Sequence, residues 1–459
     1  MGKDDNFIVA IELGSSKVTG IAGRKQPDGA IQILAFVQEP STTFIRKGRI
    51  NNVSKATQSI AGIKERLEHL TKKHIVRAYV GIGGFGMHTV SNSVLHPFES
   101  KVEVTQEMVD LMNNENRASV APGYDILEAV PQEYRLGTQT QADPVGIRTE
   151  SLEGRYLNIV TSSSVSEEIN DCFKNAGLRI AGKPITMLTL ADAMLTEPER
   201  RSGCVFVDMG AETTSVAVFK NNLLRHLAVI PLGGANVNRD IMSLQVEEEE
   251  AEALKIKYGT ACPSEDVGAQ PPIELSDGRK IPYADFIGLV EARLEEIVLN
   301  VNNQISLSPY DRSQLIGGLI LTGGVANTRD IENLVAQVTK FDKIRFVRGL
   351  RTTLRAADYP DLNRDGSCNV AIALIENGDM NCCGGDLTDN GNILIKEPET
   401  DAGGEETAEK KSDKTDKAPA QPSAPPASAE EKDTSTKVKK GWVRVKNFLT
   451  NLVKEPDEN

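Results

Sequence analysis

The sequence predicts an α/β protein whose globular part consists of two similar lobes. Residues 7–23 contain an apolar strand, a turn of small residues and a second strand, and residues 204–219 repeat this order. Further strands and segments with helical periodicity follow each copy. Because the copies lie about 200 residues apart, too far for a solenoid repeat, an internal duplication into two lobes explains the pattern best.

Composition supports a packed core and narrows the possible functions. The chain has 459 residues, of which 39% are hydrophobic, enough for two or more compact domains. Its net charge of -13 argues against nucleic-acid binding, because a phosphate-reading surface needs a basic excess. The six cysteines include no C-x-x-C pair, which predicts reduced thiols rather than a metal site. No stretch approaches about 18 consecutive apolar residues, so we expect no membrane-spanning segment.

The first copy continues as a three-stranded meander followed by a helix. The turn KQPDG leads into a third strand at residues 30–38. Residues 52–73 have helical periodicity, with Asn51 or Asn52 available as the N-cap. One face of this helix is apolar and is expected to pack on the sheet; it carries Ile60, Ile63, Leu67 and Leu70.

The next glycine-rich segment is not a dinucleotide site. Gly81, Gly83 and Gly86 form a G-x-G-x-x-G pattern, but such a site needs a helix directly after the turn. Residues 87–95 instead alternate between apolar and polar side chains, as a strand does.

The second copy resembles the first and then adds longer helices. Residues 223–234 supply its third strand and a Gly-Gly turn. Residues 317–324 form a buried strand, after which Asn327 or Thr328 can cap a helix. Helical periodicity marks residues 246–259, 283–305 and 325–338.

Each copy places an acidic residue two positions before the glycine of its turn, Glu12 before Gly14 and Asp208 before Gly210. Backbone N–H groups converge in such turns and can bind an oxyanion such as phosphate, although each turn alone is also compatible with a simple tight hairpin. If the lobes face each other, both turns can contact one polyphosphate, with Asp208 and Glu12 holding Mg²⁺ through water. Polar side chains in the two turns are Ser15, Ser16, Lys17, Thr213 and Thr214.

Two Gly-Gly pairs are candidates for the rest of a nucleotide site. Gly323 and Gly324 lie between a strand and a helix, where the backbone can approach a flat ring without obstruction by a Cβ atom. Gly233 and Gly234 follow a strand in a similar way. Close packing between strand and helix is the alternative explanation for both pairs.

The end of the chain predicts a tether and an anchor. Residues 397–436 contain no Leu, Ile, Val, Met or aromatic residue, so this part is expected to be disordered. Residues 437–455 are basic and have the periodicity of an amphipathic helix, typical of binding to anionic membrane lipid. The residues expected at the membrane are Lys440, Trp442, Arg444, Val445, Lys446, Phe448, Leu449, Leu452 and Val453. Docking on the globular part or on a partner protein is the alternative.

Four motifs together resemble the phosphate and adenosine motifs of the actin-like ATPase superfamily in order and spacing. They are IELGSSKVTGIAG, VDMGAETTSVAVF, IPLGGANVNRDI and LILTGGVANTRDIENL. Three further features resemble the FtsA family of bacterial cell-division proteins within that superfamily: AYVGIGG leading into an insertion, the helix EAEALKIKYG, and the amphipathic end. The resemblance covers about residues 6–380 and 437–455.

The resemblance implies a site for ATP and Mg²⁺ between the lobes. Glu252 and Lys255, on one helix face, would reach the ribose and adenine. The phosphate and base contacts would come from Gly14, Ser15, Ser16, Lys17, Asp208, Gly210, Thr213, Thr214, Gly233, Gly234, Gly323, Gly324 and Val325. Glu12 stands where most members of the superfamily carry Asp. Its side chain is one methylene longer, which nucleotide binding tolerates more easily than the precise activation of a water for hydrolysis. We therefore expect at most weak ATPase activity. The sequence identifies no catalytic base.

The resemblance also implies the domain organisation and partners. Its domains would be an actin-like first lobe (1–83 and 167–198), an inserted α+β subdomain (84–166), a second lobe (199–380, with 240–304 as its smaller subdomain), a disordered linker (381–436) and the membrane helix (437–455). Such a protein would polymerise as a peripheral protein on the cytoplasmic face of the cell membrane at the division septum, tether FtsZ filaments there and recruit later division proteins. The FtsZ contact would lie in the lobe that contains residues 240–300.

Three other functions share parts of this pattern. A small-molecule kinase of the same superfold would need an acidic base and no anchor, and a DnaK-type chaperone would need a β-rich peptide-binding domain after the ATPase. A pilus-assembly actin homologue is the third, and binding to the C-terminal peptide of FtsZ would discriminate it.

Overall fold

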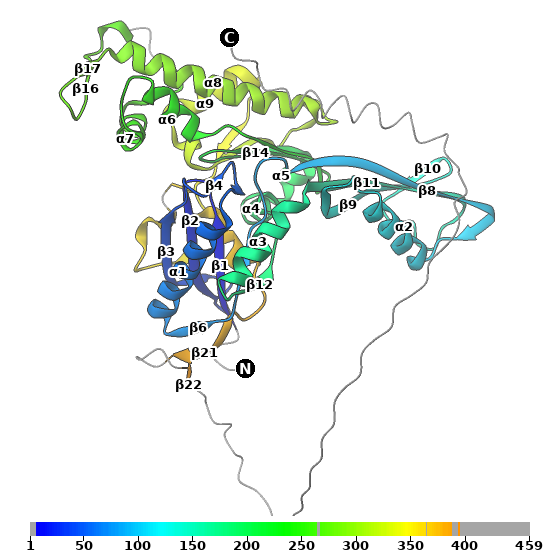
Figure 1. Cartoon of the computed structure of the whole chain (residues 1–459). Helices are drawn as coiled ribbons and strands as arrows, with labels where there is room; N and C mark the ends of the chain where they lie inside the picture. Colours follow the sequence, from blue (N-terminus) through cyan, green and yellow to red (C-terminus); the bar gives the residue numbers. More distant parts are fainter. Residues whose placement is uncertain (1–5, 264–266, 364, 388–392, 395–459) are drawn as a thin grey trace, which may run out of the picture. The chain divides into compact units, whose positions relative to one another are not determined.

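The computed structural model describes residues 6–263, 267–363, 365–387 and 393–394, which all belong to one compact unit, residues 1–396. The first lobe is built on a six-stranded sheet of order β12-β7-β1-β2-β3-β20 (Figure 1). Its strands are β1 (Phe7–Leu13), β2 (Lys17–Lys25), β3 (Ile31–Pro40), β7 (Arg77–Val80), β12 (Arg179–Gly182) and β20 (Leu354–Arg355). Strands β1, β2 and β3 pair antiparallel, whereas β7 pairs parallel with β1.

Helix α1 (Val53–Thr71) packs on β2 and β3 through the face that the sequence predicts. Asn52 is its N-cap and accepts a 3.0 Å hydrogen bond from the Lys55 N–H, while Ile60, Ile63 and Leu67 are fully buried. The prediction is wrong for Leu70, whose exposed fraction is 50%. Leu70 lies in the last turn, after which the chain turns away at Lys72 with φ 55°.

The second lobe repeats this strand arrangement and so confirms the predicted duplication. Strands β13, β14 and β15 pair antiparallel, and β18 pairs parallel with β13 as β7 does with β1. They belong to a nine-stranded sheet of order β10-β9-β11-β8-β15-β14-β13-β18-β19. The second-lobe strands are β13 (Cys204–Met209), β14 (Thr214–Lys220), β15 (Leu223–Ile230), β18 (Gly318–Thr322) and β19 (Ile344–Phe346).

Four helices cover the second lobe: α6 (Gly234–Met242), α7 (Glu248–Tyr258), α8 (Tyr283–Leu307) and α9 (Ile331–Thr339). Helix α8 contacts α6, α9 and β14. The predicted cap of α9 is wrong, because a short 3-10 helix η3 (Gly324–Asn327) comes first and Asp330 occupies the N-cap position. The Asn327 side chain donates instead to the Asp365 carbonyl oxygen, at 2.7 Å.

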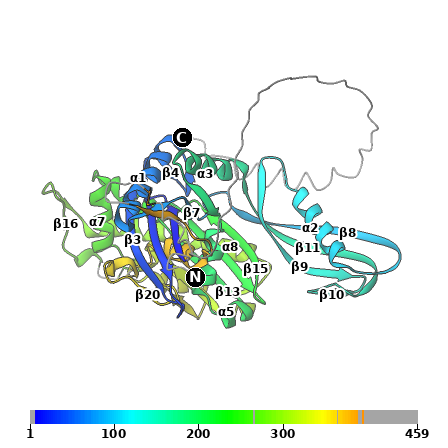
Figure 2. The same ribbon diagram turned by 90° about the horizontal axis from the view of Figure 1, so that it is seen from below.

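The segment between β7 and α3 forms a subdomain with its own small core. It contains β8 (His88–Glu103), α2 (Gln106–Ala118), β9 (Tyr124–Leu136), β10 (Gln139–Gln141) and β11 (Arg148–Ser162). Figure 2 shows β8, β9 and β11 side by side. A single pair, Ala228 with His88, continues this sheet into β15. The strand that follows Gly86 agrees with the rejection of a dinucleotide motif.

The remaining elements complete the first lobe. They are β4 (Ile45–Arg46), β5 (Arg49–Ile50), β6 (Lys73–Ile75), α3 (Ser163–Asn175), α4 (Thr186–Met194), η4 (Pro360–Asn363), α10 (Asn369–Asn377), β21 (Cys383–Leu387) and β22 (Ile393–Leu394). Helix α5 (Glu197–Ser202) instead contacts β14 of the second lobe. Short η1 (Val267–Ala269), β16 (Ile273–Glu274), β17 (Lys280–Ile281) and η2 (Arg312–Gln314) belong to the second lobe.

Two predicted boundaries differ from the structure. The prediction placed residues 199–380 in the second lobe, but α10 packs on β1, β2 and α4 because its apolar face completes the core of the first. The predicted linker began at residue 381, whereas β21 pairs with β6 and extends the first lobe. The rest of the predicted linker and the predicted membrane helix, residues 437–455, lie outside the described residues, apart from residues 393–394. No helix in the described part of the chain is long and apolar enough to cross a membrane.

Candidate functional site

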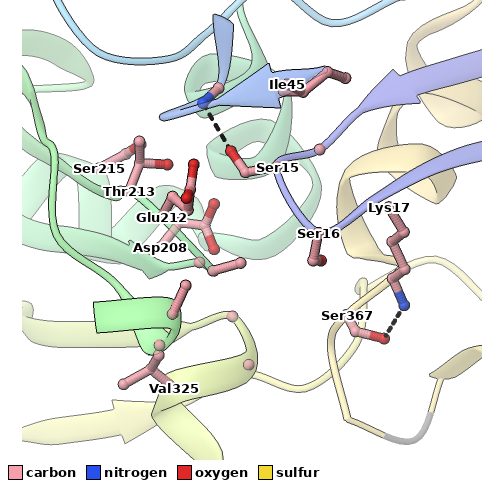
Figure 3. A pocket seen from close by; sticks show the side chains of 18 of the residues that line it. Ser15, Ser16, Lys17, Ile45, Asp208, Glu212, Thr213, Ser215, Val325 and Ser367 are labelled. Atoms are coloured by element: carbon pink, nitrogen blue, oxygen red, sulfur yellow. Dashed lines mark hydrogen bonds between the residues drawn. The ribbon is translucent and has the colours of Figure 1, made fainter. Parts of the chain in front are cut away.

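The first small-residue turn joins β1 to β2 and is fixed by backbone contacts. The Ser41 hydroxyl donates to the Gly14 carbonyl at 2.6 Å, and the Ser41 N–H donates to the Ser16 carbonyl at 3.1 Å. A Cβ atom on Gly14 would lie 2.7 Å from the Lys17 carbonyl oxygen, so this turn requires glycine there. The Lys17 ammonium donates to the Ser367 hydroxyl at 3.3 Å (Figure 3).

The second turn, between β13 and β14, has the same form. The Gly210 N–H donates to the Thr213 carbonyl at 2.9 Å and closes the turn. A Cβ atom on Gly233 would lie 2.5 Å from the Gly210 carbonyl oxygen, so the Gly-Gly segment before α6 packs directly against this turn. The N–H of Gly234 donates to the same carbonyl at 3.1 Å.

The two turns line one cavity of about 990 Å³, to which both lobes contribute. Its volume is at the upper end of the range of small-molecule and cofactor sites, about 300–1,000 Å³. Most of the residues predicted from sequence line it: Glu12, Gly14, Ser15, Ser16, Lys17, Asp208, Gly210, Thr213, Gly234, Glu252, Lys255, Gly323, Gly324 and Val325.

Two predicted residues do not line the cavity. Thr214 is fully buried and its hydroxyl donates to the Leu232 carbonyl at 2.9 Å, because side chains alternate along β14 and the next residue, Ser215, faces the cavity. Gly233 lies behind the second turn, where its lack of a side chain permits the close packing described above.

The acidic residues before the turns are held at unusual pKa values. Burial, and then the charge of Asp208, raises the pKa of Glu12 to about 8, partly offset by Lys17. Burial raises the pKa of Asp208 to about 6. The buried Oε2 atom of Glu12 has no hydrogen-bond partner among the described residues. The unsatisfied Oε2 atom of Glu12, with the Asp208 carboxyl nearby, is suited to an incoming cation.

The far end of the cavity carries a polar cluster on α6 and α7. The Glu252 carboxylate accepts hydrogen bonds of 2.6 Å from both the Lys255 ammonium and the Asn238 side-chain amide. The Oδ1 atom of Asn238 is buried and has no partner within the described part of the chain. A Cβ atom on Gly324 would meet nothing within 4 Å, so the backbone there borders open space. This end can accept a flat polar ring.

Glu212, Asn238 and Ser367 are among the residues that line the cavity without having been predicted from the sequence. Glu212 is the only charged side chain between Gly210 and Thr214, and a charge in a turn of small residues was the available signal. Asn238 and Ser367 lie on elements whose approach to the site depends on tertiary packing, so no local pattern distinguishes them.

The donor set fits a nucleotide with Mg²⁺ better than a metal bound by protein alone. Within residues 6–263, 267–363 and 365–387, no group of three or more His, Cys, Asp or Glu side chains could hold a metal ion. Mg²⁺ commonly binds through one or two carboxylates and takes its other ligands from phosphate and water. The Glu12 carboxyl, whose Oε2 atom has no hydrogen-bond partner among the described residues, meets that requirement together with Asp208 and the two turns.

Comparisons with known proteins show which family the chain is similar to. A family model described as "Cell division protein FtsA" matches residues 205–369, and one described as "SHS2 domain inserted in FTSA" matches residues 84–160. The chain is 30% identical over 349 residues to a cell division protein FtsA of Porphyromonas gingivalis, covering 74% of this chain and 72% of that protein. It is 29% identical to the FtsA of Neisseria meningitidis, covering 71% of this chain and 80% of that protein.

A solved structure extends the likeness to the fold. The structure titled "PilM-PilN type IV pilus biogenesis complex" superposes with a TM-score of 0.52 and 16% identity, covering 81% of this chain and 98% of that one. The predicted actin-like fold class is confirmed.

Proposed function

The chain belongs to the FtsA family of cell-division proteins, and from this premise we propose that it binds ATP with Mg²⁺ between its lobes and assembles on the membrane as a tether. One observation carries the proposal. Two small-residue turns from duplicated units, each preceded by a buried carboxylate, line a single cavity between the lobes.

Each end of the cavity would have its own role in binding. The turns from Gly14 to Lys17 and from Gly210 to Thr213 would contact the phosphates, with Lys17 as the cation of the first turn. Asp208 and Glu12 would hold Mg²⁺ through water. The Glu252–Lys255 pair would contact the ribose and adenine. Bound Mg²⁺ would supply positive charge that favours the ionised forms of both carboxyls.

Glu12 would couple proton release to cation binding. With a pKa of about 8 its carboxyl keeps a proton at neutral pH, because burial and the charge of Asp208 both oppose ionisation. A nearby cation reverses this balance and favours proton release. ATP would act mainly by binding one closed arrangement of the lobes better than an open one.

The assembled protein would anchor division filaments to the cytoplasmic face of the cell membrane at the septum. Residues 437–455 would bind anionic lipid, and residues 381–436 would connect this anchor to the filament. One amphipathic helix binds weakly and reversibly, so polymerisation would raise the affinity by presenting many anchors together. The partners we propose are FtsZ, further copies of the chain and later division proteins, with the inserted segment 84–166 offering a recruitment surface.

Co-sedimentation with anionic vesicles tests the proposal. The full chain and a version that ends at Thr436 would be compared with and without ATP and Mg²⁺, and neutral vesicles would serve as the control. We expect the full chain to bind anionic vesicles more strongly with ATP, and the shortened chain to lose binding. Equal binding of both versions would refute the anchor, and no effect of ATP would refute nucleotide-driven assembly.

A peptide experiment tests the division role separately. We expect the C-terminal peptide of FtsZ to bind the full chain in a fluorescence anisotropy titration, with a scrambled peptide as the control. Failure to bind would favour a pilus-assembly type scaffold on the same fold.

A further inference from the structure

A short hairpin beside the cavity connects it to the inserted subdomain. Strands β4 and β5 pair through Ile45 with Ile50 and Arg46 with Arg49, and Lys47 and Gly48 form the turn between them. Both turn residues have positive φ, 51° and 71°, as a two-residue hairpin turn of this kind requires. A positive φ costs a non-glycine residue such as Lys47 conformational energy. Contacts with the surrounding structure must therefore hold the turn in place.

The hairpin turn is hydrogen-bonded to both proposed phosphate loops, which are residues 14–17 and 210–213. The Gly48 N–H donates to the Ser15 hydroxyl at 2.8 Å, which ties the hairpin to the loop of the first lobe. The Lys47 N–H donates to Glu212 at 2.6 Å, which ties it to the loop of the second lobe.

Glu212 is suited to bridge the lobes. Its side chain is buried, and it also accepts from Arg46 at 3.0 Å and from Arg239 at 2.8 Å. Arg46 belongs to the hairpin of the first lobe and Arg239 to α6 of the second. A buried carboxylate with two guanidinium partners loses much of its stabilisation if one partner leaves, so the bridge favours one relative placement of the loop and the hairpin.

The same hairpin contacts both ends of the inserted subdomain. At the first end, the Phe85 N–H donates to the Lys47 carbonyl at 2.8 Å, and the Lys47 ammonium lies 5.5 Å from the centre of the Phe85 ring. At the other end, Arg49 donates to the Ser164 hydroxyl at 3.0 Å.

Backbone packing makes the first junction stiff. A Cβ atom on Gly48 would lie 2.6 Å from the Cα atom of Gly84, and one on Gly84 would lie 2.4 Å from the Gly48 carbonyl oxygen. Two glycines therefore pack backbone against backbone, with no side chain between them that could adjust. A displacement of the turn is passed directly to the start of the subdomain.

We propose that the β4–β5 hairpin transmits nucleotide binding in the cavity to the inserted subdomain. This inference rests on the proposed nucleotide site. A ligand that draws the two loops together displaces Ser15 and Glu212, and the hairpin follows because it is bonded to both. The hairpin's contacts with Phe85, Gly84 and Ser164 then shift the position of the inserted subdomain. The hairpin thus responds to both the cavity and the subdomain, as coupling between two sites requires.

Hydrogen exchange of the full chain, with and without Mg²⁺ and ATP, tests the coupling without measuring turnover. The amides of residues 85–92 and 157–162 report on the two junctions, and those of residues 45–50 report on the hairpin. A fluorescent ATP analogue measures nucleotide affinity in parallel. The test variant is Phe85→Ala/Ser164→Ala, which removes both side-chain links, and Ser164→Ala alone serves if the double variant unfolds.

The matched control is Ser163→Ala, the neighbouring serine, whose hydroxyl donates to Asp125 within the inserted segment at 2.7 Å. In the wild type and the control, we expect nucleotide to slow exchange at the junctions by about fivefold, the effect of about one hydrogen bond. In the test variant we expect less than about twofold slowing at residues 157–162, where Ser164 provided the link. Residues 85–92 should keep part of their response, because the Phe85 N–H still donates to the Lys47 carbonyl, and hairpin protection and nucleotide affinity should stay within about twofold of wild type.

Two results would overturn the coupling while leaving the nucleotide site intact. They are a wild type that binds nucleotide without any change at the junctions, and a test variant that responds as fully as the control. Absence of nucleotide binding by the wild type would refute the proposed function, and the coupling with it.

Discussion

Replacing Glu12 by Gln should remove most of a pH dependence that the cavity gives to stability. The ordinary pKa of this carboxyl is 4.5, and in the folded chain it is raised to about 8. A raised carboxyl pKa means that the folded state binds the proton more tightly than the unfolded state. The free energy of unfolding therefore falls as pH rises from about 4.5 to about 8, and it levels off above that pH.

The size of the effect follows from these two values. Between about pH 6 and about pH 8.5, the Glu12 carboxyl alone should lower the free energy of unfolding by about 2–3 kcal/mol, because each pH unit below the folded pKa contributes about 1.4 kcal/mol. Asp208, with a pKa of about 6, is largely ionised over this interval, and its charge opposes ionisation of Glu12. Glu12→Gln should therefore be more stable than the wild type at the alkaline end.

Urea denaturation followed by circular dichroism at a series of pH values, with EDTA and without nucleotide, measures this difference. Glu247→Gln is the control for loss of one exposed carboxyl. Adding Mg²⁺ and ATP should reduce the advantage of Glu12→Gln at high pH, since a cation favours the ionised wild-type carboxyl. Parallel pH curves for wild type and Glu12→Gln would show that Glu12 is not held protonated and would refute the reasoning.

Four further substitutions test the cavity and the cores. Lys17→Met should weaken ATP binding by about tenfold through loss of a phosphate-facing charge, measured by titration, and unchanged affinity would exclude that role. Gly20→Ala should lower the free energy of unfolding by about 1–3 kcal/mol, because the new Cβ atom would lie 2.2 Å from the Ile63 side chain. Gly62→Ala, in the helix that packs on this strand, should instead raise the free energy of unfolding by about 0.5–1 kcal/mol in the same urea series. Asn116→Ala should cost about 1–3 kcal/mol by leaving buried amide partners unpaired, and a neutral result would refute that network.

Local sequence patterns were sufficient for the repeated units and most of the cavity. The turns at Gly14 and Gly210 were predictable because strand periodicity and small residues are local signals, and their meeting in one cavity followed from the duplication. The N-cap at Asn52 was predictable for the same reason, since a cap depends on its own side chain and the next turn.

Side-chain direction and long-range packing were not predictable in the same way. Thr213 and Thr214 are equivalent in composition, and only the register of β14 decides which one faces the cavity. Helix α10 is apolar enough to pack in either lobe, and its sequence does not reveal that β1 and β2 provide the complementary surface. The placement of α10 depends on contacts with β1 and β2, which lie more than 300 residues earlier in the chain.

The hairpin of residues 45–50 explains why a long insertion need not disturb the proposed nucleotide cavity. An insertion joined by two free strands would move independently of the lobes, whereas here a single turn contacts both of its ends and both loops. Glu212 is the residue that makes this arrangement depend on lobe closure, because it reaches from the second lobe to the hairpin of the first. A small residue at position 212 would suffice for the turn of residues 210–213. The charge of Glu212 is therefore better explained by its hydrogen bonds to the hairpin than by the turn. The cavity and the inserted subdomain are therefore best understood as one mechanical unit, with Glu212 as the contact that a change in lobe arrangement must break or form.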